Sequence, residues 1–283
     1  MPIDAAFDII SFTSFIVLVV LGLGVIASMM GIFNLGHGDF VLLGAYTVFV
    51  FDELGLPIWL GMTVAPFAVA LVGLVLERTV IRRFYAAPII AMLGTYAIGV
   101  VIRETVRGLI GGLYHAIPEP LPGMIDIGDI SISRWRLTVI LITVLVVLVS
   151  YLLLRRTTLG LKIRASLENP ALARSAAIST GQIYALTFAF GCGLAGLAGA
   201  LMVPAFSLSA DLGVRFLIQA FLAIMLGGVG TFEGPIGGAA LIGATTAAFP
   251  WVMNPILADI MVFVLAIVAI RLRPTGLFTK RRL

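Results

Sequence analysis

The sequence IISFTSFIVLVVLGLGVIASMM, residues Ile9–Met30, contains no charged side chain and is followed at once by GIFNLGHGD, residues Gly31–Asp39. At a rise of about 1.5 Å per residue, the first stretch forms a helix of roughly 33 Å, which is long enough to cross a bilayer. The second stretch places Asn, His and Asp among three glycines. At membrane depth, irregular backbone and ionisable groups are tolerated only where protein buries them or water reaches them. Together the two stretches predict a membrane helix that leads into an internal polar segment.

The whole chain has the composition of a polytopic helical membrane protein. Of its 283 residues, 61% are hydrophobic and 11% are charged, whereas soluble domains carry roughly 25% charged residues. The mean hydropathy is +1.16. The apolar runs are continuous, whereas a transmembrane barrel gives short alternating segments. We therefore expect a single all-α membrane domain over residues 1–283.

Nine apolar runs follow one another along the chain, and several are short or interrupted by glycine and proline. They predict a transmembrane bundle of eight or nine spans in which some helices are broken or short. The runs lie at about 9–30, 40–51, 57–76, 86–110, 137–154, 182–203, 214–229, 236–252 and 255–272.

Lysine and arginine gather in three segments, 78–83, 155–174 and 271–282, and such clusters mark the cytoplasmic side of a membrane protein. The C-terminus is therefore expected in the cytoplasm, and the N-terminus is expected outside for nine spans or inside for eight. An outer loop is expected at about 111–136. Within it, Met124–Ser133 alternates isoleucine with polar residues, which predicts a small β-hairpin.

The polar segment predicts a wall or gate of a transport path. Asn34 and His37, three residues apart, would share one face of a helix, and Asp39 lies just beyond. A charged group at mid-bilayer costs about 2.5–3.5 kcal/mol on insertion scales, and apolar packing would not need three such side chains. The alternative is that His37 and Asp39 finish a helix at the inner membrane face. A metal site is not expected, because no second histidine is near and the chain has one cysteine.

A second break occurs late in the chain, in the glycine-rich stretch Gly227–Gly238. Gly228, Gly230 and Glu233 are its candidates for a path or gate, since paired interrupted segments toward the two ends of a transporter point to its path. Close packing of helices through small residues is the alternative for most of these glycines.

The apolar run that follows the first basic group supplies further polar residues. Gly94 and Thr95 inside it are candidates for lining the path. Near its end, Arg103, Glu104 and Arg107 are explained by a snorkelling cluster at the outer face, in which Glu104 pairs with one of the arginines.

The basic loop at about 155–181 has the pattern of two short helices joined by a sharp turn. Asn169 can cap the second helix and Pro170 fits its first position, and the residues that follow are rich in alanine. An interfacial helix on anionic lipid is the alternative. Because the second helix has one charge, Arg174, and no bulky anchor, we favour a surface on which another protein docks.

Four motifs together resemble those of the permease family of high-affinity branched-chain amino-acid ABC importers. The resemblance extends from residue 31 to 278 and so covers nearly the whole chain. One departure is Ala177-Ile178, where that family usually has Gly-Ile. The motifs are Gly31–Phe40 with Gly44-Ala45-Tyr46 after it, the loop ending in Asn169-Pro170 with its alanine-rich helix, Gly227–Gly238, and Arg271–Phe278.

The resemblance implies a multi-pass permease subunit in the bacterial cytoplasmic (inner) membrane that translocates branched-chain or related hydrophobic amino acids. Its partners would be a second homologous permease, two cytoplasmic ATPase subunits, an extracytoplasmic substrate-binding protein and membrane lipid. ATP and Mg²⁺ would bind to the ATPase subunits, since this chain has no GxxxxGK[ST] sequence. No cofactor and no nucleic acid are expected on it. With no apparent nucleophile–base constellation, the chain is not expected to be an enzyme by itself.

The resemblance also implies that the cytoplasmic loop couples ATP hydrolysis to transport. Related permeases serve urea and short amides, which is the alternative substrate class. The rival mechanism is a stand-alone secondary transporter or channel, with proton coupling through Asp39 or Glu233. The residues assigned to the coupling loop are Glu168, Asn169, Pro170, Ala173, Arg174, Ala176, Ala177 and Ile178.

Overall fold

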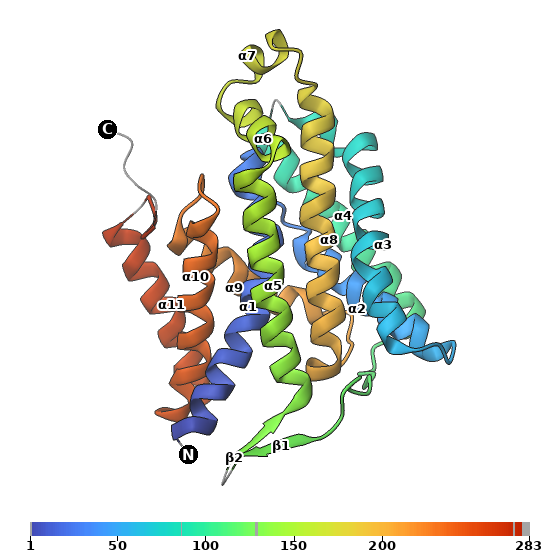
Figure 1. Ribbon diagram of the computed structural model, residues 1–283, viewed down its shortest axis with the longest axis vertical. Helices are drawn as coiled ribbons and strands as arrows, with labels where there is room; N and C mark the ends of the chain where they lie inside the picture. The colour runs from blue at the N-terminus through green and yellow to red at the C-terminus, as the bar shows by residue number, and fades with distance from the viewer. Residues whose placement is uncertain (1, 86, 128–129, 274, 279–283) are drawn as a thin grey trace.

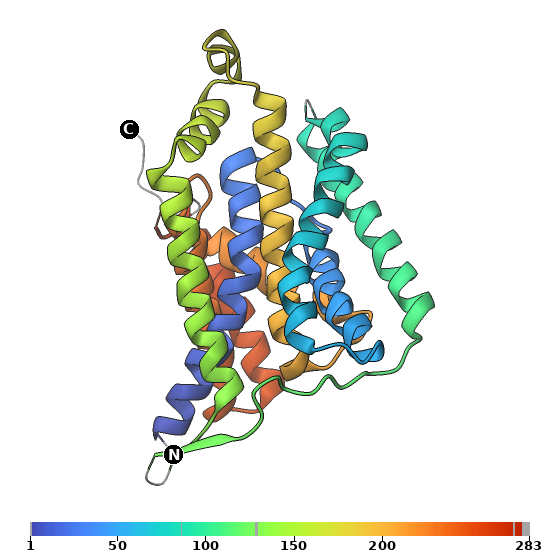
Figure 2. The same ribbon diagram turned by 45° about the vertical axis from the view of Figure 1, so that its right-hand side comes forward.

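The computed structural model describes residues 2–85, 87–127, 130–273 and 275–278, and in this part of the chain it has eleven α-helices and one two-stranded hairpin (Figures 1 and 2). Two short 3₁₀ helices, η1 and η2, complete the regular structure. The elements are α1 (Pro2–Met30), α2 (His37–Glu53), α3 (Ile58–Thr79), η1 (Ile81–Phe84), α4 (Pro88–Ile110), β1 (Met124–Ile127), β2 (Ile130–Ser133), α5 (Arg134–Arg156), α6 (Thr158–Glu168), α7 (Pro170–Ser175), α8 (Thr180–Phe206), α9 (Leu212–Gly227), α10 (Glu233–Ala248), η2 (Phe249–Trp251) and α11 (Pro255–Leu272).

Six helices are long and apolar enough to cross a membrane, namely α1, α3, α4, α5, α8 and α11. The helices α2, α9 and α10 have 17, 16 and 16 residues. At about 1.5 Å per residue they are roughly 24–26 Å long, which is less than a hydrocarbon core of about 30 Å. The polytopic helical fold with short and broken helices is thus confirmed, while the number of complete crossings stays a prediction.

Successive apolar helices run in alternating directions along the long axis (Figure 1). The start of α1 and the hairpin lie at one end, and α6 and α7 lie at the other. The helices α3, α5 and α11, which precede the three basic segments, all run toward the α6–α7 end. Nine membrane segments that alternate in direction require this arrangement. The N-terminal end of α1 then lies at the end of the bundle opposite the basic loop at about 155–181. If positive segments face the cytoplasm, that end faces outside.

The bundle has an inner layer and an outer layer. In α1 and α8, 78% and 83% of the apolar window is buried, against 17–28% in the other four long helices. Small residues bring the inner helices close together: a Cβ added to Gly44 of α2 would lie 2.0 Å from the carbonyl oxygen of Gly196 in α8. The outer helices expose large apolar side chains, such as Phe67 and Leu141, as a lipid-facing surface requires.

The predicted hairpin in the outer loop is confirmed. Strands β1 and β2 pair antiparallel, with Met124 opposite Ser133 and Ile127 opposite Ile130, and the turn at residues 128–129 lies outside the described residues. At the start of α5, Ser133 caps the helix by accepting from the backbone N–H of Arg136. Arg136 in turn pairs with Asp8 of α1 at 2.8 Å, which ties the hairpin end to the first helix.

Candidate functional site

The polar segment lies deep inside the bundle. The chain leaves α1 at Gly31, whose φ is +70°, and becomes helical again at His37. The Nε2 atom of His37 hydrogen-bonds to the carbonyl oxygen of Val19 at 3.0 Å, and Val19 precedes the end of α1 at Met30 by 30 − 19 = 11 residues. That separation corresponds to roughly 17 Å of helix. His37 begins α2 and lies well within the length of α1, which favours the path interpretation over the alternative at the inner membrane face.

Glycines allow three helices to close on this segment. A Cβ on Gly22 of α1 would lie 3.0 Å from Cε1 of His37 and 2.5 Å from the carbonyl oxygen of Gly191 in α8. From the other side, a Cβ on Gly36 would lie 2.4 Å from the carbonyl oxygen of Thr95 in α4. Contacts shorter than 3.0 Å leave no room for a side chain, so these glycines set how closely the helices pack around the break.

Helix α4 supplies a hydrogen-bond partner for a backbone group that the break in the helix leaves unpaired. The side chain of Asn34 accepts a hydrogen bond from the N–H of Gly36 at 3.1 Å, which forms a tight local turn. The N–H of Leu35 donates to Oγ1 of Thr95 at 3.0 Å, and Thr95 donates to the carbonyl oxygen of Met92 at 2.8 Å. The predicted candidate Thr95 therefore bonds to the backbone of Leu35, 60 residues away in sequence and next to the candidate Asn34.

Two polar atoms of the segment have no partner in the described part of the chain. Both Asn34 and His37 are 0% exposed, yet Nδ2 of Asn34 and Nδ1 of His37 form no hydrogen bond. With Nε2 of His37 bonded to the carbonyl oxygen of Val19, Nδ1 is left as an acceptor. An unsatisfied buried polar group costs about 1–3 kcal/mol. The segment thus offers one donor and one acceptor to a molecule or to a rearranged helix.

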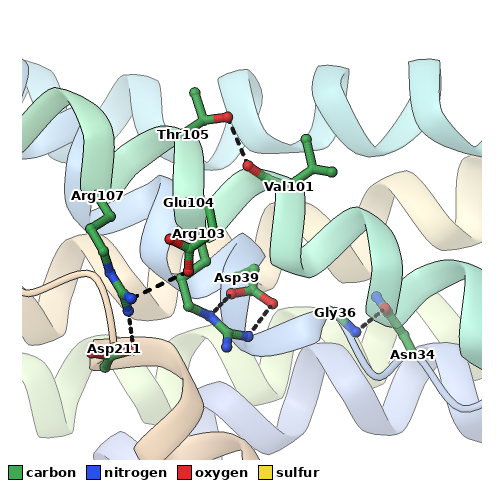
Figure 3. Close-up of polar contacts among 9 residues, drawn as sticks. All are labelled: Asn34, Gly36, Asp39, Val101, Arg103, Glu104, Thr105, Arg107 and Asp211. Carbon is green, nitrogen blue, oxygen red and sulfur yellow. Dashed lines mark hydrogen bonds and ion pairs between the residues drawn. The ribbon is translucent and has the colours of Figure 1, made fainter.

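Asp39 forms a buried ion pair with Arg103 of α4 (Figure 3). Nε of Arg103 donates to Oδ1 at 2.9 Å, and Nη2 donates to Oδ2 at 3.1 Å, so the contact is bidentate. The side chain of Asp39 is 2% exposed and that of Arg103 is 16% exposed. Gly99 makes room for the carboxylate, since a Cβ there would lie 2.2 Å from Oδ2. Thr95, Gly99 and Arg103 are four residues apart and form the face of α4 that covers the break.

Arg103 is a site residue that sequence reasoning missed. The sequence pattern places Arg103 in an outer-face cluster with Glu104 and Arg107. In the described structure, Glu104 pairs with Arg107 at 3.3 Å, and Arg107 also pairs with Asp211 at 2.7 Å (Figure 3). These three side chains are each more than 40% exposed. A signal was present: a carboxylate at Asp39 inside the membrane needs a cation, and Arg103 follows Thr95 by eight residues on one helix face.

The late glycine-rich stretch joins the C-terminal motif instead of the early break. Gly228 and Gly230 have φ of +91° and +96°. A Cβ on Gly276 would lie 2.3 Å from Cα of Gly228, and the N–H of Leu277 donates to the carbonyl oxygen of Leu226 at 2.8 Å. The two motifs that the sequence shows separately, Gly227–Gly238 and Arg271–Phe278, therefore form one packed unit.

Glu233 and Gly94 lie away from the buried polar segment. Glu233 is about half-exposed and pairs with Arg155 at the end of α5, at 2.6 Å. Gly94 is half-buried, and a Cβ there would lie 3.7 Å from the ring of Phe84. The structure thus brings together Asn34, His37, Asp39 and Thr95 and leaves Gly94, Gly228, Gly230 and Glu233 elsewhere, and their role in a path stays a prediction.

The basic loop at about 155–181 has the two short helices that the sequence predicts. Between α6 and α7, Oδ1 of Asn169 accepts from the N–H of Leu172 at 3.0 Å, and Pro170 is the first residue of α7. Ala173 packs inward at 4% exposure, while Arg174 and Ala176 are exposed.

The turn that follows α7 is strained at Ala177. Its φ is +59°, a left-handed conformation that costs a residue with a Cβ about 1–2 kcal/mol. Glycine would adopt it without that cost, which gives a physical reason for the glycine that the family usually has there.

These features define a polytopic membrane protein of the transport class, with a buried polar break enclosed by small residues. Residues 5–270 match the family described as "Branched-chain amino acid transport system / permease component", and the chain belongs to this family. Its function class is therefore that of a transport permease component.

Curated relatives agree over most of the chain. It is 28% identical to the high-affinity branched-chain amino acid transport system permease protein BraD of Pseudomonas aeruginosa, covering 92% of this chain and 90% of that protein. It is 24% identical to LivH of Escherichia coli K12, with the same coverage. It is 27% identical to a probable LivH of Methanocaldococcus jannaschii, covering 83% and 76%.

Among solved structures, PsaBC from Streptococcus pneumoniae in complex with Fab is similar, with a TM-score of 0.51. The sequence identity is 13%, and the match covers 93% of this chain and 90% of that one. This likeness shows a shared fold.

Proposed function

We propose that this chain is a permease subunit of an ABC importer and that it carries branched-chain or related hydrophobic amino acids across the bacterial cytoplasmic membrane. The observation that carries the proposal is the non-helical break at residues 31–36 with the start of α2, where Asn34, His37 and Asp39 are buried inside the bundle and two of their polar atoms have no partner among the described residues. Within a family of transport permeases, such a segment fits the wall or gate of the path.

The other subunits of the transporter follow from this proposal. A second, homologous permease completes the path, and an extracytoplasmic binding protein delivers the amino acid at the hairpin end. Two ATPase subunits, with ATP and Mg²⁺, dock at α6 and α7, which project from the bundle at the other end (Figure 2). The exposed surface of α7 and of the residue that follows it, Ala176, would receive them, and the C-terminus would lie on the same, cytoplasmic side.

The contacts of the two acids argue against a stand-alone proton-coupled transporter. Asp39 is held by two hydrogen bonds from Arg103, and Glu233 is half-exposed and paired with Arg155. A proton-coupling carboxylate must gain and lose its proton inside the membrane, and each of these two carboxylates is held by hydrogen bonds from an arginine that would have to be broken when it is protonated.

The deciding experiment is uptake into proteoliposomes that contain this chain with its homologous permease, the ATPase subunits and the binding protein. We expect ATP-dependent uptake of leucine, isoleucine or valine, and little uptake of urea or acetamide. Uptake of urea in preference to leucine would move the proposal to the amide class. Uptake by this chain alone, driven by a pH gradient without ATP, would overturn it.

A further inference from the structure

A pocket of about 590 Å³ opens at the end of the bundle that carries α7. It lies between the turn that joins α3 to α4 and the start of α8, with α7 at its side. None of its residues belongs to the buried polar segment, so it is a separate feature of the molecule.

Two cations face this pocket without an acidic partner. Arg82, from η1, and Arg174, from α7, both line it, and neither forms an ion pair with a carboxylate within the described ranges. Four arginines elsewhere in the described structure are paired with an aspartate or glutamate, namely Arg103, Arg107, Arg136 and Arg155, whereas the two in this pocket belong to the arginines without such a pair. The pocket therefore holds positive charge that the chain itself does not neutralise.

A threonine and a helix start add further donors. Thr180 lines the pocket, and the residue as a whole is 7% exposed. It begins the 27-residue helix α8, and the side chain of Ser179 does not cap this helix. The first N–H groups of a helix have no acceptor within it, and its positive dipole end favours phosphate.

The two tyrosines that line the pocket leave its arginines as the charged groups that face it. The phenols of the two tyrosines are engaged elsewhere: Tyr85 donates to a carboxylate oxygen of Glu77, and Tyr184 donates to the carbonyl oxygen of Ser166 at 2.9 Å. Gly181 lets the guanidinium of Arg82 approach α8, since a Cβ there would lie 3.3 Å from Nη2.

The surroundings of the pocket indicate which anion fits. On the two helices that the α3–α4 turn joins, Val75 is 51% exposed and Ile89 is 74% exposed, so exposed apolar surface adjoins the turn that supplies Arg82. A phospholipid supplies both a phosphate for the cations and acyl chains for the apolar flank. Free phosphate, or an acidic side chain of another protein, would leave that flank uncovered. We propose that this pocket binds the headgroup phosphate of an anionic phospholipid through Arg82, Arg174 and Thr180.

The test is a lipid titration of the purified full chain in mild detergent, followed by native mass spectrometry. The probes are dioleoyl phosphatidylglycerol and, as a zwitterionic control, dioleoyl phosphatidylcholine. We expect the Arg82→Gln variant to bind phosphatidylglycerol roughly five- to tenfold more weakly, as loss of one arginine–phosphate contact implies. Arg83→Gln is the matched control, because Arg83 is exposed in the same turn but does not line the pocket, and its affinity should stay within about twofold.

A second variant changes the position of the cation without changing the charge. In Gly181→Ala the new methyl group would lie 3.3 Å from Nη2 of Arg82, so the guanidinium must shift slightly, and phosphatidylglycerol binding should weaken less than in Arg82→Gln while the net charge stays the same. Three results would overturn the proposal: equal loss in Arg82→Gln and Arg83→Gln, equal affinity of the natural chain for the two lipids, or displacement of phosphatidylglycerol by millimolar inorganic phosphate. Loss of a co-purifying protein from Arg82→Gln, with lipid affinity unchanged, would instead assign the pocket to an acidic partner.

Discussion

Asp39 carries a charge inside an apolar bundle because Arg103 reaches it with two donors. Removing two charges from water costs several kcal/mol each, so such a pair adds little net stability over well-packed apolar residues. Its retention is better explained by a function that uses the two charges, such as opening and closing α4 against the break. A single replacement, by contrast, leaves one buried charge without its partner.

We expect Asp39→Asn to destabilise the protein by about 3–5 kcal/mol, because the guanidinium of Arg103 stays buried without a counter-charge. The measurement is the thermal unfolding midpoint in detergent. The double variant Asp39→Leu with Arg103→Met should regain most of the stability and still fail to transport. A double variant that transports leucine at the natural rate would show that the pair serves packing alone.

Single residues of the break could be predicted from sequence, but their partners could not. Asn34, His37 and Asp39 stand out because polar side chains are rare between apolar runs. Their depth depends on how α2 packs against α1, and no local pattern gives that distance. Arg103 lies 64 residues from Asp39 in sequence, and beside Glu104 and Arg107 it has the composition of an ordinary outer-face cluster.

At the scale of elements, α4 is fitted to the break by its glycines. It lies at the edge of the bundle (Figure 2) and contacts the break through the face that carries Thr95, Gly99 and Arg103. In Gly99→Ala the new Cβ would lie 2.2 Å from Oδ2 of Asp39 and 2.9 Å from Cα of Gly36, so α4 must move outward.

We expect Gly99→Ala to lower stability by about 1–3 kcal/mol, the usual cost of overpacking, and to reduce transport. The matched control is Gly108→Ala in the same helix, where a Cβ meets nothing within 4 Å. That variant gains helix propensity of about 1 kcal/mol at most. Equal unfolding midpoints for the two variants would contradict the close approach of α4.

The helix α7 is the element on which coupling to ATP hydrolysis is proposed to depend. Ala176, the residue directly after it, is exposed, whereas Ala173 within it faces inward, so a large side chain at 176 would obstruct a docking partner without disturbing the loop. We expect Ala176→Trp to reduce ATP-dependent uptake at least about tenfold, which corresponds to about 1.4 kcal/mol of lost docking free energy. ATPase activity and uptake are measured in the same proteoliposomes, with Ala97→Trp, an exposed position of α4, as control. Unchanged coupling in Ala176→Trp would count against the docking role.

The positions of the helices and strands along the chain could be predicted from the sequence more closely than the contacts between them. The hairpin and the two short cytoplasmic helices each carry a local signal, in alternation or in capping residues. The packing of Gly227–Gly238 against the C-terminal motif is a tertiary contact. Gly276 fits against Gly228 only because both residues have a positive φ and lack a Cβ. Neither stretch alone indicates the other.

At the scale of the whole molecule, the alternating helices place the hairpin and α7 at opposite ends (Figure 1). The charges agree with this arrangement, since the segments rich in arginine follow α3, α5 and α11, which run toward α7. Because positive segments stay in the cytoplasm, the hairpin with the start of α1 should be outside. An even number of membrane crossings from the hairpin to the end of α11 would place the last basic segment on the same side as the hairpin and so contradict this topology.

Labelling of single cysteines in whole cells with a membrane-impermeant maleimide tests this topology. The natural Cys192 is buried at 0% exposure, so it should give little background. We expect Ser131→Cys, exposed on the hairpin, to react in intact cells, and Ser175→Cys, exposed on α7, to react only after the membrane is permeabilised. Reaction of both positions in intact cells would mean that the basic loop is not cytoplasmic. The ATPase subunits could not then dock on α7, because ATP is supplied on the cytoplasmic side, and the ABC proposal would fail together with the topology.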